Sequence, residues 1–137
     1  ADTVSVVDAK SLEVLTTVPA PKFPIRVKIT PDGKRALVSC AQSGDVAVFD
    51  VGSRKEIKRM GLDREAVAAG TETRLFSTRF GKSPVPVGLL IAPDGKRAWV
   101  ASTNADVVSV IDLEKLEVVG RLTAGKEPDG LAGRFSR

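Results

Sequence analysis

The sequence predicts an all-β fold made of four-stranded antiparallel sheets, and two repeated motifs carry this prediction. The segment Pro31–Arg35 returns as Pro93–Arg97, a shift of 62 residues. A run of alternating valines occurs three times, and its closing residues Asp8, Asp50 and Asp112 are separated by 42 and then 62 residues. Blades of a β-propeller repeat every 40 to 50 residues, so the longer spacing indicates a blade with an insertion of roughly twenty residues. We therefore expect about two and a half to three propeller blades, as a partial ring or a ring completed by oligomerisation.

The same order of strands is expected in each repeat. Pro-Asp-Gly favours a tight turn, because proline fixes φ and glycine accepts the left-handed conformation, and it predicts a hairpin between the first and second strands. The valine run is the third strand, and a more polar fourth strand suits the outer edge of a sheet. A flat sandwich of similar strands is the alternative, but it would not repeat its turn sequence at the period of a blade. The expected strands are 4–8 and 13–18, then 27–29, 36–38, 46–50 and 56–60, then 88–91, 98–101, 108–112 and 117–122, with a candidate opening strand at 130–135.

These elements divide the single propeller segment into five parts. Residues 1–18 supply the last two strands of a partial blade, 25–60 and 87–122 are complete blades, 61–86 is an inserted connection, and 123–137 starts a further blade. In the insertion, Asp63 and Gly70 predict the two caps of a short helix, and 73–80 predicts an extra hairpin or a segment packed on the blade. A blade buries one face on each neighbour, so two apolar faces stay open. Further blades, a separate partner or a homo-oligomer, such as a dimeric ring of about six blades, would cover them.

Composition excludes several classes of function. The chain has no histidine and one cysteine, which removes the usual general base, zinc ligand and haem ligand as well as any internal disulfide. We expect no catalytic residue, no cofactor and no metal site. The net charge of +4 is spread along the chain and aromatic residues are few, which argues against a nucleic-acid partner. No apolar run approaches the roughly 20 residues of a membrane-spanning helix, so we expect no membrane insertion.

Several single residues receive structural interpretations. Cys40 is expected to be a small buried residue rather than a reactive thiol. The repeated Asp8, Asp50 and Asp112 are expected to bond nearby backbone in turns rather than to bind metal. Trp99 is expected in the core between blades, and Gly88 where another backbone approaches closely.

The candidate ligand site lies on the face where the long connections emerge. In propeller topology, the connections between blades and those from second to third strands share one face, which is the usual binding face. Cationic side chains and an amide on this face predict a mouth that accepts anions. The alternative is a solvated surface whose charges keep the chain soluble. The candidate residues are Lys22, Arg26, Arg74, Arg79, Lys82, Asn104 and Lys126.

The chain resembles the YVTN-repeat β-propeller family. The resemblance rests on Thr3–Asp8, Val14–Pro19 and Pro31–Ser39, and it covers nearly all of the chain except 61–80. It implies a closed ring of seven blades and an exported protein, hence a periplasmic or extracellular location, although the sequence leaves a cytoplasmic one open. Related propellers include lactonase-like enzymes and domains that carry haem d1.

Three functions are consistent with these observations. The leading hypothesis is a noncatalytic binding or assembly scaffold that recognises a protein, glycan or small anion on the face bearing the insertion. The alternative is a fragment of a propeller enzyme or cofactor-carrying domain, lactonase-like or haem d1-like, whose active groups lie in missing blades. A third hypothesis is a purely structural repeat segment that self-associates.

Overall fold

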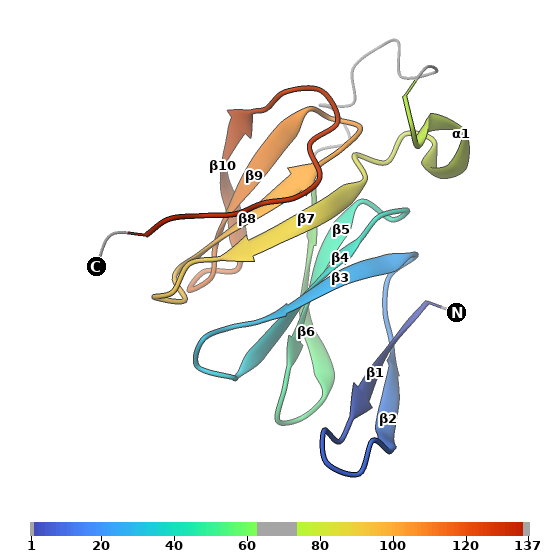
Figure 1. The fold of residues 1–137 in the computed structure, drawn as a ribbon, viewed down its shortest axis with the longest axis vertical. Helices are drawn as coiled ribbons and strands as arrows, with labels where there is room; N and C mark the ends of the chain where they lie inside the picture. Colours follow the sequence, from blue (N-terminus) through green and yellow to red (C-terminus); the bar gives the residue numbers. More distant parts are fainter. Residues whose placement is uncertain (1, 63–73, 136–137) are drawn as a thin grey trace.

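The computed structural model describes residues 2–62 and 74–135, which form three antiparallel sheets in succession (Figure 1). The first sheet has two strands and the others have four, in the orders β3-β4-β5-β6 and β7-β8-β9-β10. The predicted all-β fold of propeller blades is therefore confirmed. The elements are β1 (Thr3–Val7), β2 (Val14–Pro19), β3 (Pro24–Ile29), β4 (Arg35–Cys40), β5 (Asp45–Asp50), β6 (Lys55–Gly61), α1 (Ser77–Phe80), β7 (Pro86–Ile91), β8 (Arg97–Ser102), β9 (Val107–Asp112) and β10 (Glu117–Thr123).

Both predicted hairpin turns form between the first and second strands of the four-stranded sheets. Gly33 and Gly95 adopt φ of 72° and 71°, the left-handed conformation that the turn requires. Asp32 and Asp94 accept the backbone N–H two residues later, at 3.0 and 2.9 Å. The two turns also touch, because the Pro31 ring lies beside Gly95.

The repeated aspartates at the ends of the third strands have the predicted turn role. Asp8 accepts the N–H groups of Lys10 and Ser11, and Asp112 accepts the N–H groups of Glu114 and Lys115. Asp50 accepts both the N–H and the hydroxyl of Ser53. These bonds stabilise the ionised carboxylate and hold the pKa of each aspartate below its ordinary value.

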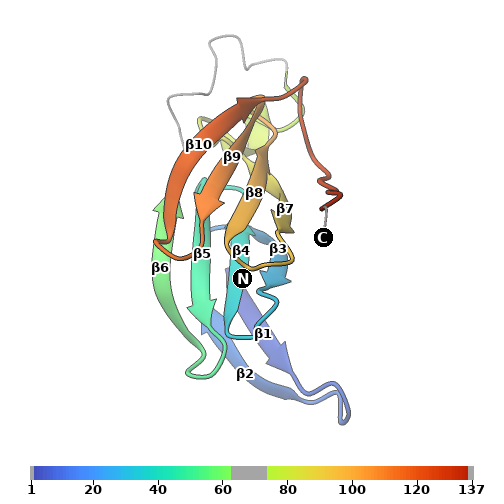
Figure 2. The ribbon, with the colours of Figure 1, turned by 90° about the vertical axis from the view of Figure 1, so that its left-hand side faces the viewer.

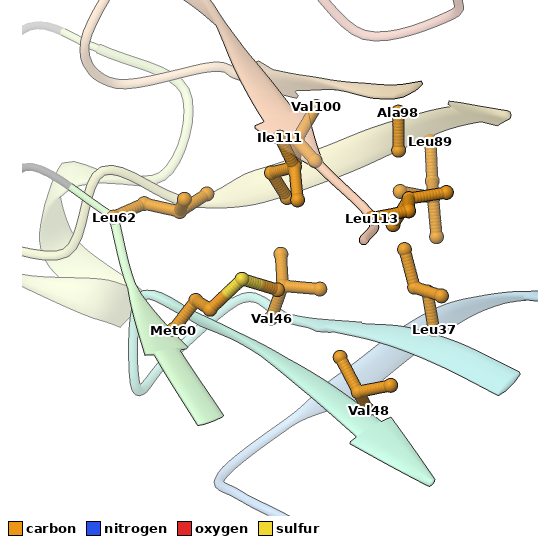
Figure 3. Packing of buried hydrophobic residues seen from close by; sticks show 10 residues of the cluster. All are labelled: Leu37, Val46, Val48, Met60, Leu62, Leu89, Ala98, Val100, Ile111 and Leu113. Atoms are coloured by element: carbon orange, nitrogen blue, oxygen red, sulfur yellow. The ribbon is translucent and has the colours of Figure 1, made fainter. Parts of the chain in front are cut away.

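The main core lies between the two four-stranded sheets. Alternating residues of β4 and β5, Leu37, Val46 and Val48, face the neighbouring sheet and are fully buried. Figure 3 shows Leu37 pointing toward Leu113 and Leu89 across this interface. Such interlocking of one blade face with the next is how propellers bury their apolar surface. The remaining members of the core cluster are Met60, Leu62, Ala98, Val100 and Ile111.

The opposite face of the β3–β6 sheet packs on the two-stranded sheet. Val38, Cys40 and Phe49 contact Val4 and Val18 there. Figure 2 shows the three sheets following one another along the long axis of the molecule. Cys40 is fully buried as expected, and desolvation raises the pKa of its thiol to about 12.

The C-terminal segment corrects one prediction, because residues 130–135 form no strand. The segment runs over the outer face of the last sheet, where the Phe135 ring lies 5.8 Å from the Trp99 ring. Trp99 is thus half-buried on the face that points away from the main core. Gly88 makes this course possible, because a Cβ there would lie 1.8 Å from the Asp129 carbonyl oxygen. The predicted backbone approach at Gly88 is confirmed.

The inserted connection runs between the end of β6 at Gly61 and the start of β7 at Pro86. The helix predicted between Asp63 and Gly70 lies outside the described residues. The extra hairpin is not formed at 74–80, where a turn precedes the short helix α1, but the expected packing on the blade is confirmed. Among the described residues, no helix has the length and apolar character needed to cross a bilayer.

Candidate functional site

The connections expected to share one face are joined to one another by hydrogen bonds. Ala41, after β4, donates its N–H to the Phe23 carbonyl oxygen, and the Ser83 hydroxyl donates to the Ala41 carbonyl oxygen at 2.6 Å. The N–H of Asn104, after β8, donates to the Pro84 carbonyl oxygen. Loops from both four-stranded sheets and the insertion therefore form one continuous surface, which we call the connection face.

An aromatic cluster anchors the insertion to the β3–β6 sheet. The Phe80 ring at the end of α1 meets the Phe23 ring edge to face, with centroids 4.9 Å apart, and the Phe76 ring lies 5.7 Å away. The Arg79 guanidinium stacks over Phe23 at 4.8 Å and over Phe80 at 5.5 Å. A cation over an aromatic face is stabilised by the ring quadrupole, so this arginine is held on the cluster.

An ion pair anchors the same segment to the β7–β10 sheet. Both terminal nitrogens of Arg74 donate to the two carboxylate oxygens of Asp106 at 2.5 Å, with 15% and 26% of the side chains exposed. Asp106 also accepts the N–H of Glu127, whose own carboxylate accepts the N–H of Leu75. The Arg74 hydrogen bonds hold the pKa of Asp106 at about 2, below its usual 3.8.

Part of this arrangement is itself repeated. Asp2 accepts the N–H of Phe23 at 2.9 Å, and Asp106 accepts the N–H of Glu127 at 2.9 Å, over the same spacing of 21 residues. Each aspartate lies just before the third strand of its blade. Its carboxylate binds a backbone N–H in the connection that leads from that blade into the next. What distinguishes Asp106 is the additional arginine from the insertion.

Buried polar groups lie beneath the connection face. Asn104 is fully buried, and its side-chain nitrogen donates to the Ser83 carbonyl oxygen at 3.3 Å. Within 2–62 and 74–135, the Asn104 Oδ1 atom and the Ser102 hydroxyl are buried without a hydrogen-bond partner. Buried polar atoms of this kind commonly bind an internal water.

The predicted anion-accepting residues lie in different surroundings in the structure. Arg74 and Asn104 are committed to protein contacts, and Arg79 is exposed but stacked on aromatic rings. Lys126 lies near the Arg74 ion pair, since its charge contributes to the lowered pKa of Asp106. The other three, Lys22, Arg26 and Lys82, are exposed.

Sequence reasoning missed Asp106, although the repeat contains a signal for it. The equivalent position in the preceding blade, 62 residues earlier, is Gly44, which adopts φ of 74°, and Asp106 adopts φ of 53°. Aspartate tolerates the left-handed conformation better than most residues. An aspartate that replaces a turn glycine thus adds a carboxylate where the other repeat has none.

A hollow with a volume of about 520 Å³ lies between the two Pro-Asp-Gly turns, away from the candidate residues named above. Asp32, Arg35, Asp94, Lys96 and Glu114 line it with mixed charge. Among the residues that the structure describes, no three metal-ligating side chains come together.

Comparisons with known proteins place the chain among β-propellers. Neither models of protein families nor curated proteins match the sequence. The fold is similar to Kuenenia stuttgartiensis hydrazine synthase, with a TM-score of 0.76 and 28% identity over 94% of this chain and 32% of that one. It is also similar to the dihydro-heme d1 dehydrogenase NirN, solved in complex with DHE, with a TM-score of 0.64 and 15% identity over 88% of this chain and 22% of that one. Both are β-propeller proteins, and this chain spans about a third or less of their length.

Proposed function

We propose that this chain is a noncatalytic assembly scaffold, a set of propeller blades whose two outer faces dock onto further blades or copies. The observation that carries the proposal is that large apolar residues are exposed on an outer face, whereas the residues at the equivalent positions of another repeat are buried. Leu122 on β10 is 53% exposed, whereas Met60, its equivalent 62 residues earlier, is 5% exposed. Burying a leucine side chain stabilises an interface by roughly 1.5 to 3 kcal/mol, so such faces favour association.

The connection face supplies the binding role of the scaffold. Its loops rest on two rigid sheets and are held by the Arg74 ion pair and the aromatic cluster. Lys22, Lys82 and Lys126 remain exposed around it, and we propose that they attract an anionic group of a protein, glycan or small molecule.

Light scattering across a concentration series tests the assembly role. We expect the wild type to form a dimer or larger species as concentration rises, and Leu122→Lys to shift that equilibrium toward monomer. Ile57→Lys is the control, because Ile57 is exposed to a similar degree, 48%, but lies on β6, whose Met60 is already buried in the core between the two four-stranded sheets. A wild type that stays monomeric at every concentration contradicts assembly through these faces.

The similarity to hydrazine synthase favours a second candidate, a segment of a larger propeller enzyme. In that case the catalytic groups come from other parts of the assembly, and these blades shape the ring. Assays of hydrazine formation and of lactone hydrolysis, run on the purified chain, test whether the chain carries catalytic groups of its own. Turnover by this chain alone would contradict the noncatalytic proposal.

A further inference from the structure

The two-stranded sheet offers an open edge. Among the described residues, β1 pairs with β2 alone, whereas the corresponding β5 and β9 each pair on both sides. An unpaired strand edge presents free N–H and C=O groups and readily accepts another strand.

An apolar groove of about 240 Å³ runs alongside this edge. Val4 and Val6 of β1 form one side, and Val27, Ile29 and Ala36 of the neighbouring sheet are among the residues on the other. The groove therefore combines a strand edge with an apolar floor, which are the two features that a docking β-strand needs.

The internal repeat shows what is missing from the groove. Val27 and Val51 are 52% and 41% exposed, but their equivalents 62 residues later, Leu89 and Leu113, are 5% and 1% exposed. In the complete interface, Leu37 of β4 points toward both of these leucines (Figure 3). The groove lacks the counterpart of Leu37.

The register fixes where that counterpart would lie. Leu37 is opposite Val48 on β5, and Val48 corresponds to Val6 on β1, 42 residues earlier. Directly opposed residues of an antiparallel pair lie on the same face of the sheet, so the missing leucine belongs to a strand that pairs with β1 opposite Val6.

A polar contact adds to this description of the strand. Arg35, two residues before Leu37, lies opposite Asp50 and donates from Nη1 to the Leu113 carbonyl oxygen. At the open edge the equivalents of this aspartate and this carbonyl are Asp8 and Val51. An arginine two residues before the leucine would therefore meet a carboxylate and a carbonyl oxygen at the end of the groove.

We propose that the edge of β1 and the adjoining groove bind a β-hairpin of a further propeller repeat, whose second strand reads Arg-x-Leu and pairs antiparallel with β1. The leucine fills the groove opposite Val6, and the arginine bonds to Asp8 and the Val51 carbonyl. The inference rests on the proposed scaffold function and specifies the partner at one of its two faces.

A labelled hairpin peptide tests this docking in trans. The peptide has the sequence of residues 24–40, with Cys40→Ser, and its fluorescence anisotropy is followed as the full chain is added. We expect saturable binding that weakens at least tenfold when the peptide carries Leu37→Asp or the chain carries Val27→Lys. The chain variant Ile57→Lys is the matched control and should bind as the wild type does.

A fusion covers the case in which the free peptide does not fold, since isolated hairpins are marginal in water. A copy of residues 24–42 is placed directly ahead of Ala1, which preserves the repeat spacing because Ala1 corresponds to Ser43. We expect the fusion to raise the Tm by roughly 5 °C, and Leu37→Asp in the copy to cancel the rise.

Each outcome decides the inference. Saturable binding that Val27→Lys abolishes, or a Tm rise that depends on the leucine, supports it. Absence of both effects overturns it, and the scaffold function still stands if the chain assembles through the Leu122 face. If that assembly is absent as well, both proposals fail. A homo-oligomer that Val27→Lys dissolves, and that the peptide cannot displace, would show that a second copy occupies the groove and would also overturn the inference.

Discussion

Replacement of Asp106 by asparagine should loosen the insertion from the last sheet. Asparagine keeps an oxygen that can accept the Glu127 N–H but removes the charge that Arg74 binds. The drop in the Asp106 pKa from 3.8 to about 2 corresponds to about 2 kcal/mol at full effect. Because both side chains are partly exposed, solvent screening reduces the expected loss to about 1 to 2 kcal/mol at pH 7.

The stability that Asp106 contributes should decrease as the pH falls. A carboxylate whose pKa is lowered by folding stabilises the native state above pH 3.8, and the stabilisation is lost as pH falls through about 2. Urea denaturation of Asp106→Asn should therefore show its full deficit at pH 7 and converge toward the wild type between about pH 4 and pH 2. Other aspartates also lose stabilisation on acidification, so the difference between the two proteins is the quantity to follow.

Two further variants make the test specific. Asp129→Asn removes an exposed charge from the same connection and should change the free energy of unfolding by less than about 0.5 kcal/mol. Arg74→Gln combined with Asp106→Asn should cost less than the sum of the two single changes, since both break one pair. If Asp106→Asn unfolds like the wild type at pH 7, or if the deficit persists unchanged at low pH, the ion pair does not hold the insertion.

Three other predictions concern the blades themselves. Gly88→Ala should displace the C-terminal segment, costing roughly 1 to 3 kcal/mol and shifting the tryptophan emission to longer wavelength, whereas Gly130→Ala, with open space around its Cβ, should leave the emission unchanged. Leu37→Ala should lower the free energy of unfolding by roughly 2 to 5 kcal/mol, measured in urea, against less than about 1 kcal/mol for Ile57→Ala; equal losses would contradict the placement of the core. The Cys40 thiol, with its pKa near 12, should resist a disulfide reagent at pH 8 until the chain is unfolded, and rapid labelling of the native protein would show that it is not buried.

The sequence predicted the blades well because their signals are local and repeated. A Pro-Asp-Gly turn and a strand of alternating valines each act within a few residues, and their recurrence fixed the register. The prediction of a strand at 130–135 was wrong because it followed from the order of strands in the repeat, whereas the two glycines of this segment disfavour a strand and strand formation also requires a partner strand. In the structure its Phe135 contacts Trp99 through side chains alone.

The contacts of the candidate site were harder to predict, because they join residues far apart in the chain. Arg74 was predicted as an anion-accepting residue, but its partner Asp106 lies 32 residues away, and no periodic pattern links the two. Arg79 was likewise expected to attract an anion, and its stacking on Phe23 depends on the path of the insertion. Local patterns therefore place such residues on a face without specifying their partners.

The inserted connection also has an evolutionary consequence. It leaves the blade at Gly61 and returns at Pro86, and the residues of the main core lie outside these limits except for Leu62. The connection after β2 is far shorter. Nevertheless Val18 on β2 packs between the first and second sheets in the way that its equivalent on β6, Met60, packs between the second and third. A repeat protein of this kind can therefore lengthen one loop after duplication without adapting the surfaces that join its blades. New recognition elements can accumulate there while the architecture stays the same.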